Sequence, residues 1–146
     1  MQVKPPIIAA GCLLVALVLH VLFSTLRFAF PGHQIAGVLL GLAGVLVAVT
    51  AVRRFRSRGT TVEPFEMPSA LVTSGAYRYT RNPMYLGILL VLLGIAVLLA
   101  SVPLLVAPLA FFIVINTRQI PFEEARLSGL FGDDYDAYRR QTRRWL

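Results

Sequence analysis

This chain has few charged residues, few acids and a single cysteine. Asp, Glu, Lys and Arg make up 14% of its 146 residues, whereas soluble domains carry about 25%. Cys12 is the only cysteine, which excludes an internal disulfide and a cysteine-based metal site. The chain also lacks a Ser-His-Asp set, a phosphate-binding glycine loop and His/Cys spacing for a metal. We therefore expect no hydrolase site and no metal.

Long apolar runs occupy most of the chain, and 57% of its residues are hydrophobic. A helix needs about 20 residues to cross about 30 Å of hydrocarbon. Breakers at Pro31-Gly32 and at Ser101-Val102-Pro103 separate the apolar runs. We predict an all-α integral membrane protein, a single domain over 1–146, with about four transmembrane helices in two hairpins. The expected spans are 7–26, 33–52, 83–100 and 103–117.

The basic residues indicate an orientation. The formal charge is +7, and thirteen of the fourteen Lys and Arg residues fall on one side if the N-terminus is inside, with Arg27 alone outside. Positive charge is retained on the cytoplasmic side. We therefore expect cytoplasmic termini, cytoplasmic segments 53–82 and 118–146, and a prokaryotic plasma membrane location. The first run is longer than a signal-peptide core, so we interpret it as a retained span. Membrane lipids, and not nucleic acid, are the expected surroundings.

Two features inside the spans favour helix packing over ligand binding. Gly37, Gly41, Gly44 and Ala48 form a small-residue stripe that lets another helix approach closely. His20 lies within the first span, where a polar side chain can mark a substrate path. A hydrogen bond from His20 to a neighbouring helix is the more common alternative, and we favour it.

The segment Ser74–Gly87, SGAYRYTRNPMYLG, concentrates polar and aromatic residues directly before an apolar run. Asn82 and Pro83 are typical of a helix N-terminus, with Asn as cap. Tyrosine and arginine are typical of a membrane surface. These two explanations account for the cap and the anchors, but not for the whole cluster.

A second polar block follows the fourth apolar run. Glu124, Leu127, Leu130 and Phe131 share one helical face, which predicts a C-terminal amphipathic helix on the membrane surface. Adjacent Glu123 and Glu124 at a membrane boundary need water, arginine or a cationic ligand. A solvated helix start, favoured by the helix dipole, is the alternative explanation.

Both blocks resemble one family. Arg81-Asn82-Pro83-Met84-Tyr85-Leu86-Gly87 resembles the Arg-His-Pro-x-Tyr-x-Gly signature of the isoprenylcysteine carboxyl methyltransferase family, whose relatives include the phospholipid N-methyltransferases. Glu123-Glu124-x-x-Leu127, with Phe131-Gly132, Tyr135, Tyr138 and Arg144, resembles its C-terminal pattern. The resemblance extends over roughly 60–146. Asn82 replaces the usual histidine, and Arg143 stands where many relatives have proline.

The resemblance implies methyl transfer from S-adenosylmethionine, with the loop and C-terminal helix forming the site. It assigns catalytic roles to Arg81, Glu123, Glu124 and Arg144. The cofactor-binding residues that it implies are Gly75, Tyr77, Arg81, Asn82, Pro83, Tyr85, Leu86, Gly87, Glu123, Glu124, Tyr135 and Tyr138.

The acceptor stays open at this point. A lipophilic acceptor fits a site at the membrane, and an isoprenylcysteine-like carboxylate, a phospholipid amine and a small hydrophobic thiol or acid all qualify. An ammonium acceptor needs a base, for which a glutamate is available. The alternative function is a non-catalytic membrane carrier or assembly protein that retains the fold. The sequence indicates no oligomeric state.

Overall fold

The computed structural model describes residues 3–57, 59 and 68–146, so part of the expected cytoplasmic segment 53–82 lies outside the described residues. Within the described residues the chain is helical, and its strand-like pairing is one isolated bridge. The long helices are α1 (Pro5–Leu22), α2 (His33–Ser57), α3 (Pro83–Leu98), α4 (Val106–Val114) and α5 (Ile120–Gln141). The shorter elements are η1 (Gly75–Arg78), η2 (Pro103–Leu105) and the π-helix η3 (Ile115–Gln119).

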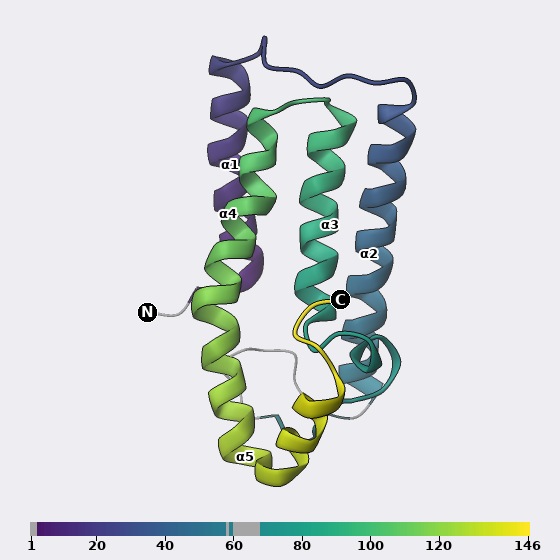
Figure 1. Cartoon of the computed structure of the whole chain (residues 1–146), viewed down its shortest axis with the longest axis vertical. Coiled ribbons are helices and arrows are strands. Elements are labelled where there is room, and N and C mark those ends of the chain that lie inside the picture. Colours follow the sequence, from purple (N-terminus) through teal and green to yellow (C-terminus); the bar gives the residue numbers. More distant parts are fainter. Residues whose placement is uncertain (1–2, 58, 60–67) are drawn as a thin grey trace.

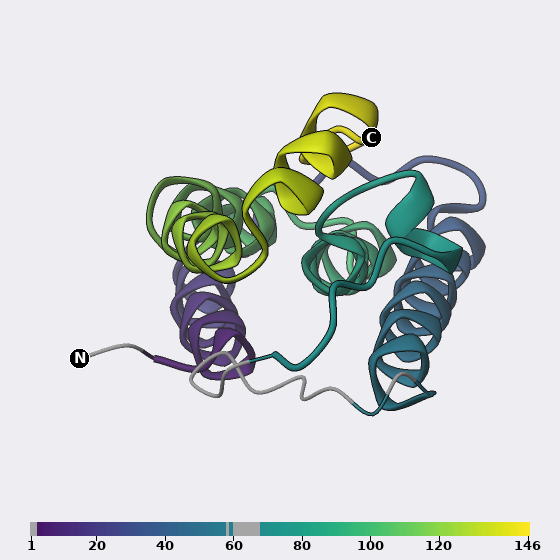
Figure 2. The same cartoon turned by 90° about the horizontal axis from the view of Figure 1, so that it is seen from below.

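The helices stand side by side, with α1 and α2 on opposite flanks of α3 and α4 (Figures 1 and 2). Helices α1 and α2 follow each other in the chain, but each packs mainly against other elements. Helix α2 packs along α3, and α1 packs mainly against α4 and η2. This separation leaves an apolar cavity between α1, α2 and α3, which we call the interhelix cavity. This cavity is open on one side, and its empty space, with the open side included, is about 620 Å³. Residues such as Leu13, Val49 and Val91 line it.

The small-residue stripe of α2 forms the contact with α3. A Cβ atom on Gly44 would lie 2.5 Å from the Gly87 carbonyl oxygen, and one on Gly94 would lie 2.7 Å from the Gly41 nitrogen. Only glycine allows the two backbones to come this close. The predicted packing role of the stripe is therefore confirmed.

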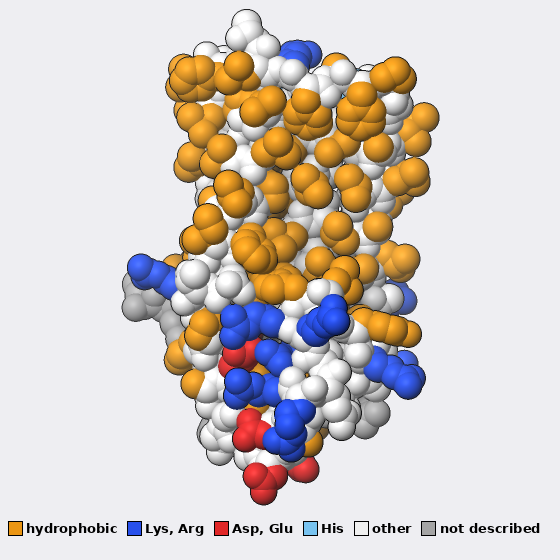
Figure 3. Space-filling view, in the orientation of Figure 1, with side chains coloured by type: hydrophobic (Ala, Val, Ile, Leu, Met, Phe, Trp, Pro, Cys, Tyr) orange, Lys and Arg blue, Asp and Glu red, His pale blue; other side chains and the backbone are white. Residues whose placement is uncertain are grey.

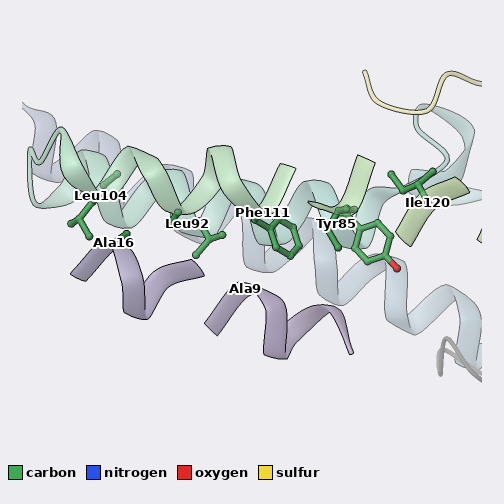
Figure 4. Packing of buried hydrophobic residues seen from close by; sticks show 10 residues of the cluster. Ala9, Ala16, Tyr85, Leu92, Leu104, Phe111 and Ile120 are labelled. Carbon is green, nitrogen blue, oxygen red and sulfur yellow. The ribbon is translucent and has the colours of Figure 1, made fainter. Parts of the chain in front are cut away.

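The core lies between α1, α3 and α4 and runs along the bundle (Figure 4). Leu104, Leu92, Phe111 and Tyr85 form a row that faces the small residues of α1. Phe111 is completely buried, as are Ile115 and Ile120 further along the chain. The row thus continues from the hydrocarbon region to the start of α5, where Tyr85 and Ile120 lie.

At the end of the bundle opposite the termini, two loops pair with each other. Val102 N–H donates to the Leu26 carbonyl at 3.0 Å, and Phe28 N–H donates to the Ala100 carbonyl at 3.1 Å. This pairing draws the chain out of helical geometry, so α1 ends at Leu22 and not at the predicted residue 26. His20 Nδ1 lies 2.8 Å from the buried Ser101 hydroxyl oxygen, which confirms the packing interpretation of this histidine.

The fourth apolar run and the C-terminal helix form one continuous rod. Pro108 lies in the first turn of α4, where a missing N–H breaks no helical hydrogen bond, so it causes no kink in the middle of the helix. The chain then passes through η3 directly into α5. The predicted C-terminal helix is present as α5, and it continues the apolar run without a loop, because Pro121 lies in its first turn and does not interrupt the rod. Gly132, at φ 48° and ψ −122°, turns the last part of α5 back toward α3 (Figure 1).

Length and composition identify this chain as an all-α membrane protein. Three helical stretches are long and apolar enough to span a bilayer, namely Pro5–Leu22, His33–Ser57 and Pro103–Gln141, and Pro83–Leu98 is apolar but shorter. The last stretch has 39 residues, which corresponds to about 58 Å at 1.5 Å per residue. Its charged part, from Arg118 on, therefore lies outside the hydrocarbon. Figure 3 shows hydrophobic side chains over most of one face and charged ones gathered at the end.

Candidate functional site

A pocket opens at the end of the bundle where α2 finishes and α3 begins. Its walls come from the end of α2, the segment 68–72, the stretch from η1 to α3, and α5. The empty space, with its open mouth included, is about 990 Å³, which matches sites for small molecules. The lining residues are Phe55, Pro68, Ala70, Leu71, Val72, Tyr77, Arg81, Asn82, Met84, Tyr85, Ile120, Glu123, Glu124, Arg126, Leu127, Tyr135 and Tyr138. Both polar blocks of the sequence meet here.

Glu123 is held by two donors on one of its oxygens. The Tyr85 hydroxyl donates to Glu123 Oε1 at 2.5 Å, and Gln119 Nε2 donates to the same oxygen at 2.8 Å. Burial raises the pKa of Glu123, and these two hydrogen bonds oppose that rise without cancelling it. Glu123 therefore takes up a proton more readily than an ordinary glutamate.

Glu124, one residue later, is an ion-pair partner of two arginines. Arg81 NH2 lies 2.8 Å from Glu124 Oε1, and Arg144 NH2 lies 2.6 Å from Oε2. Burial alone would raise the pKa of Glu124, but the hydrogen bonds from Arg144 and Arg81 lower it below its usual range. Both oxygens of Glu124 are thus occupied, so this carboxylate fixes Arg81 and Arg144 in place.

Arg81 also binds the C-terminal tail, residues 142–146. Its backbone N–H donates to the Arg143 carbonyl at 2.9 Å, and its NH1 donates to the carbonyls of Arg139 and Thr142. Arg81 Nε is buried and has no hydrogen-bond partner among the described residues. Arg81 therefore holds both the tail and the end of α5 against the start of α3, and its Nε has no partner among the described residues.

Asn82 takes the N-cap position of α3 but does not cap it with its side chain. Its Nδ2 donates instead to the Arg144 carbonyl at 2.9 Å, an oxygen that also accepts from the Thr80 hydroxyl. The predicted capping hydrogen bond is therefore absent: the side chain of Asn82 binds the returning tail through its Nδ2 donor, and its oxygen accepts no N–H of α3. Pro83 begins α3 as expected.

Besides Tyr85 of α3, three tyrosines line the pocket, Tyr77 from η1 and Tyr135 and Tyr138 from α5. Tyr138 donates its hydroxyl to the Tyr77 carbonyl at 2.7 Å and so ties α5 to η1. Burial raises the pKa of Tyr135 to about 12, so its phenol stays protonated at neutral pH. The hydroxyls of Tyr77 and Tyr135 have no protein partner in the part of the chain that the structure describes. They are available as donors to a ligand.

The predicted site residues fall into two groups. Eight of them line the pocket: Tyr77, Arg81, Asn82, Tyr85, Glu123, Glu124, Tyr135 and Tyr138. Gly75, Pro83, Leu86, Gly87 and Arg144 do not line it. Gly75 adopts a left-handed φ of 67° beside Arg54, and Gly87 lies against Gly44 in the helix contact. Arg144 acts on the pocket through Glu124.

Two residues near the site were not predicted. Gln119 hydrogen-bonds Glu123, and the Asn116 side-chain oxygen accepts a hydrogen bond from Trp145 Nε1 at 3.0 Å. Both are amides at the end of an otherwise apolar run, and a polar residue at such a place is a functional signal. That signal could have identified them.

Comparison with known proteins identifies the family. The model of the phospholipid methyltransferase family matches residues 33–134. This chain belongs to the phospholipid methyltransferase family. The match covers α2, α3, α4 and most of α5, and so includes every lining residue of the pocket except Tyr135 and Tyr138.

Individual relatives agree with this assignment. A protein-S-isoprenylcysteine O-methyltransferase of Schizosaccharomyces pombe is 39% identical over 75 residues, which are 49% of this chain and 30% of the relative. A probable protein-S-isoprenylcysteine O-methyltransferase of Oryza sativa is 35% identical over 81 residues, 53% of this chain and 41% of the relative. An uncharacterized protein of Haemophilus influenzae is 41% identical over 63 residues, 43% of this chain and its own full length. This chain thus spans less than half of the two named methyltransferases.

Proposed function

We propose that this chain transfers the methyl group of S-adenosylmethionine to a lipophilic acceptor at the membrane boundary. The observation that carries the proposal is the meeting of two distant polar blocks, Arg81–Tyr85 and Glu123–Tyr138, in one pocket. Family membership and the relatives named as methyltransferases support it. The site lies where α3 leaves the apolar part of the bundle, so an acceptor in the bilayer has a short path to it.

The pocket has groups that suit the donor. A sulfonium compound with an amino-acid and a nucleoside part needs an anion, hydrogen-bond donors and an apolar wall. Glu123 provides the anion, Tyr77 and Tyr135 provide hydroxyls, and Phe55 and Leu127 provide apolar surface. Arg81 contributes the unsatisfied Nε, which suits a carboxylate. S-adenosylmethionine supplies a methyl group already activated by the sulfonium charge.

The protein's own work is then positioning, exclusion of water and proton acceptance. Tyr85 and Gln119 fix Glu123 at the pocket wall, where it accepts the proton of an amine acceptor. A carboxylate or thiolate acceptor requires no such proton transfer. Glu124, Arg81 and Arg144 hold the tail and the start of α3 together at the edge of the pocket, which Glu124 and Arg81 line.

The interhelix cavity supports a lipophilic acceptor. Gly87 and Ile88 line this cavity, and Met84 and Tyr85, one helical turn earlier on α3, line the pocket. A hydrocarbon chain in the cavity would thus end close to the pocket. Isoprenylcysteine-like carboxylates, phospholipid amines and small hydrophobic thiols or acids remain the candidate acceptors, and a prokaryotic plasma membrane remains the proposed location.

The test is binding of S-adenosylmethionine and its demethylated product to the purified protein by calorimetry, in detergent and in lipid. The wild type should bind, and Glu123→Gln should weaken binding by about 10-fold or more, since a hydrogen bond to a charged group is lost. Asp134→Asn, which removes an exposed charge at the tip of α5, should bind like the wild type.

Labelled methyl should also reach a lipid or thiol that organic solvent extracts from membranes. Absence of both binding and transfer in a folded sample would sink the proposal. The non-catalytic carrier or assembly protein would then be the better explanation.

A further inference from the structure

The rod formed by α4 and α5 contains one π-helical turn, η3, directly before the site. Ile120 N–H donates to the carbonyl of Ile115, five residues back. Pro121 is the local cause of this turn. In a regular α-helix, the ring of Pro121 would clash with the carbonyl of Thr117, four residues earlier. A wider turn relieves this clash without breaking the rod. Such π-turns occur often at functional sites.

The wider turn changes which residues face the pocket. Successive residues of an α-helix lie 100° apart, and a π-turn displaces the helix after it by about one residue. Gln119, the last residue of the turn, is buried, whereas Thr117 and Arg118 are exposed. Gln119 therefore points inward at the level of Glu123, one turn further along.

The hydrogen bonds on Glu123 are asymmetric. Gln119 Nε2 and the Tyr85 hydroxyl both donate to Oε1, at 2.8 and 2.5 Å. Oε2 has no hydrogen-bond partner in the described ranges 3–57, 59 and 68–146. One oxygen is thus used by the protein, and the other is left for a ligand in the pocket that Glu123 lines.

Charged and titratable groups from η1, α3 and α5 surround Glu123. They are Tyr77 of η1, Tyr85 of α3, and Glu124 and Arg126 of α5. Burial raises the pKa of Glu123, and the donors Tyr85 and Gln119 lower it by stabilising the carboxylate. Removing one of these donors should therefore raise the pKa further.

We propose that Gln119 is a positioning residue, which the π-turn aims at Glu123 so that Oε1 is held and Oε2 is presented to the substrate in the pocket. The substrate part of this inference rests on the proposed function. The hydrogen-bonding part does not, because it concerns two side chains of the chain itself. Gln119 touches Glu123 and does not line the pocket.

The experiment is an infrared pH titration of the whole protein in lipid nanodiscs, which follows the C=O stretch of the protonated Glu123 carboxyl. Glu123→Gln identifies the band by its loss. Gln119→Met keeps the bulk of the side chain and removes the donor. It should move the midpoint of the titration to a pH about one unit higher, as expected for a lost hydrogen bond to a carboxylate.

Thr117→Val is the matched control, because Thr117 lies in the same π-turn and its hydroxyl donates to the Ile113 carbonyl, away from Glu123. Its titration should coincide with that of the wild type. Gln119→Ala, which cannot overpack the site, should move the midpoint in the same direction as Gln119→Met. A wild-type midpoint in the folded Gln119 variants overturns the inference.

Methyl transfer separates this inference from the proposed function. In an active wild type, Gln119→Met should lower kcat more than it raises KM and should shift the acidic limb of the pH profile upward. A shifted infrared titration in a protein that transfers no methyl supports the role of Gln119 and refutes the enzymatic proposal. Unaltered kcat and titration in Gln119→Met, beside an active wild type, refute the role of Gln119 alone.

Discussion

At the scale of single residues, the two adjacent glutamates differ in almost every property. Glu123 faces Tyr85 and Gln119 inside the pocket, while Glu124 faces Arg81 and Arg144. Neighbours on a helix point about 100° apart, so one carboxyl can meet neutral donors while the next meets cations. The opposite directions of their pKa shifts follow from this difference.

Replacing Glu124 should release the C-terminal tail. Glu124→Gln leaves Arg81 and Arg144 without their anionic partner, and we expect a loss of about 2 kcal/mol in the free energy of unfolding at pH 7. The only tryptophan, Trp145, packs on Phe112 with ring centroids 5.1 Å apart. Its fluorescence emission should shift to longer wavelength when the tail leaves.

The same interaction should depend on pH. Glu124 has a folded-state pKa below its ordinary value of 4.5, so its ion pairs contribute fully above that value. The contribution disappears as the pH falls through the lowered folded-state pKa. The free energy of unfolding and the Trp145 emission should therefore differ between wild type and Glu124→Gln at pH 7. In acid, both quantities should become the same in the two proteins. Equal stability at pH 7 would contradict the ion-pair role, and Asp134→Asn is the control.

At the scale of elements, the contact between α2 and α3 adjoins the site. Gly44 and Gly87 bring the two backbones together outside the pocket, two residues along α3 from Tyr85, which lines it. This contact explains a glycine in the signature segment without assigning it to the cofactor. The role of Gly87 in binding stays a prediction, whereas its role in packing is visible.

Gly44→Ala should destabilise the protein by about 1–3 kcal/mol, the usual cost of overpacking. Its new Cβ would lie 2.5 Å from the Gly87 carbonyl oxygen and 2.8 Å from the Val91 nitrogen, so the backbones would have to separate. Gly41→Ala is the matched control in the same helix, because its Cβ would meet nothing within 4 Å. Equilibrium unfolding in mixed micelles measures the free energy of unfolding of both variants. Equal losses in Gly44→Ala and Gly41→Ala would argue against the close contact between α2 and α3.

At the scale of the whole molecule, charge and hydrophobicity are stratified along the long axis. Figure 3 shows a broad apolar zone, then a zone rich in Lys and Arg, then acids at the tip. Arginines at the edge of an apolar zone attract anionic lipids, by about 1 kcal/mol each near the surface. The stratification therefore suits a protein whose pocket lies at the level of the headgroups.

The predicted orientation can be tested with cysteines. Cys12→Ala removes the only thiol, and Arg27→Cys and Arg140→Cys then place one exposed thiol at each end. Because positive charge stays inside, a membrane-impermeant maleimide should label Arg27→Cys in intact cells and Arg140→Cys only after lysis. Labelling of Arg140→Cys in intact cells would reverse the orientation.

Local signals predicted much of the fold. Helices α2 and α3 begin at His33 and Pro83 as expected, because Pro31-Gly32 and Asn82-Pro83 act on their immediate neighbours. The end of α1 was predicted four residues too late, since only pairing with the distant segment 100–102 reveals it. The hydrogen bond of the Asn82 side chain was missed for the same reason, because it joins Nδ2 to the carbonyl of the distant Arg144 and not to the start of α3.

The sequence by itself determined the membrane character, the apolar segments, the two polar blocks and the family, because composition, breakers and motifs are local. Only the tertiary structure decided which glutamate accepts hydrogen bonds from Tyr85 and Gln119, and which one holds Arg81 and Arg144. Those outcomes depend on the rotation of α5 relative to α3. The π-turn before Pro121 and the reversal at Gly132 place α5, and contacts with α3 and η1 hold it there.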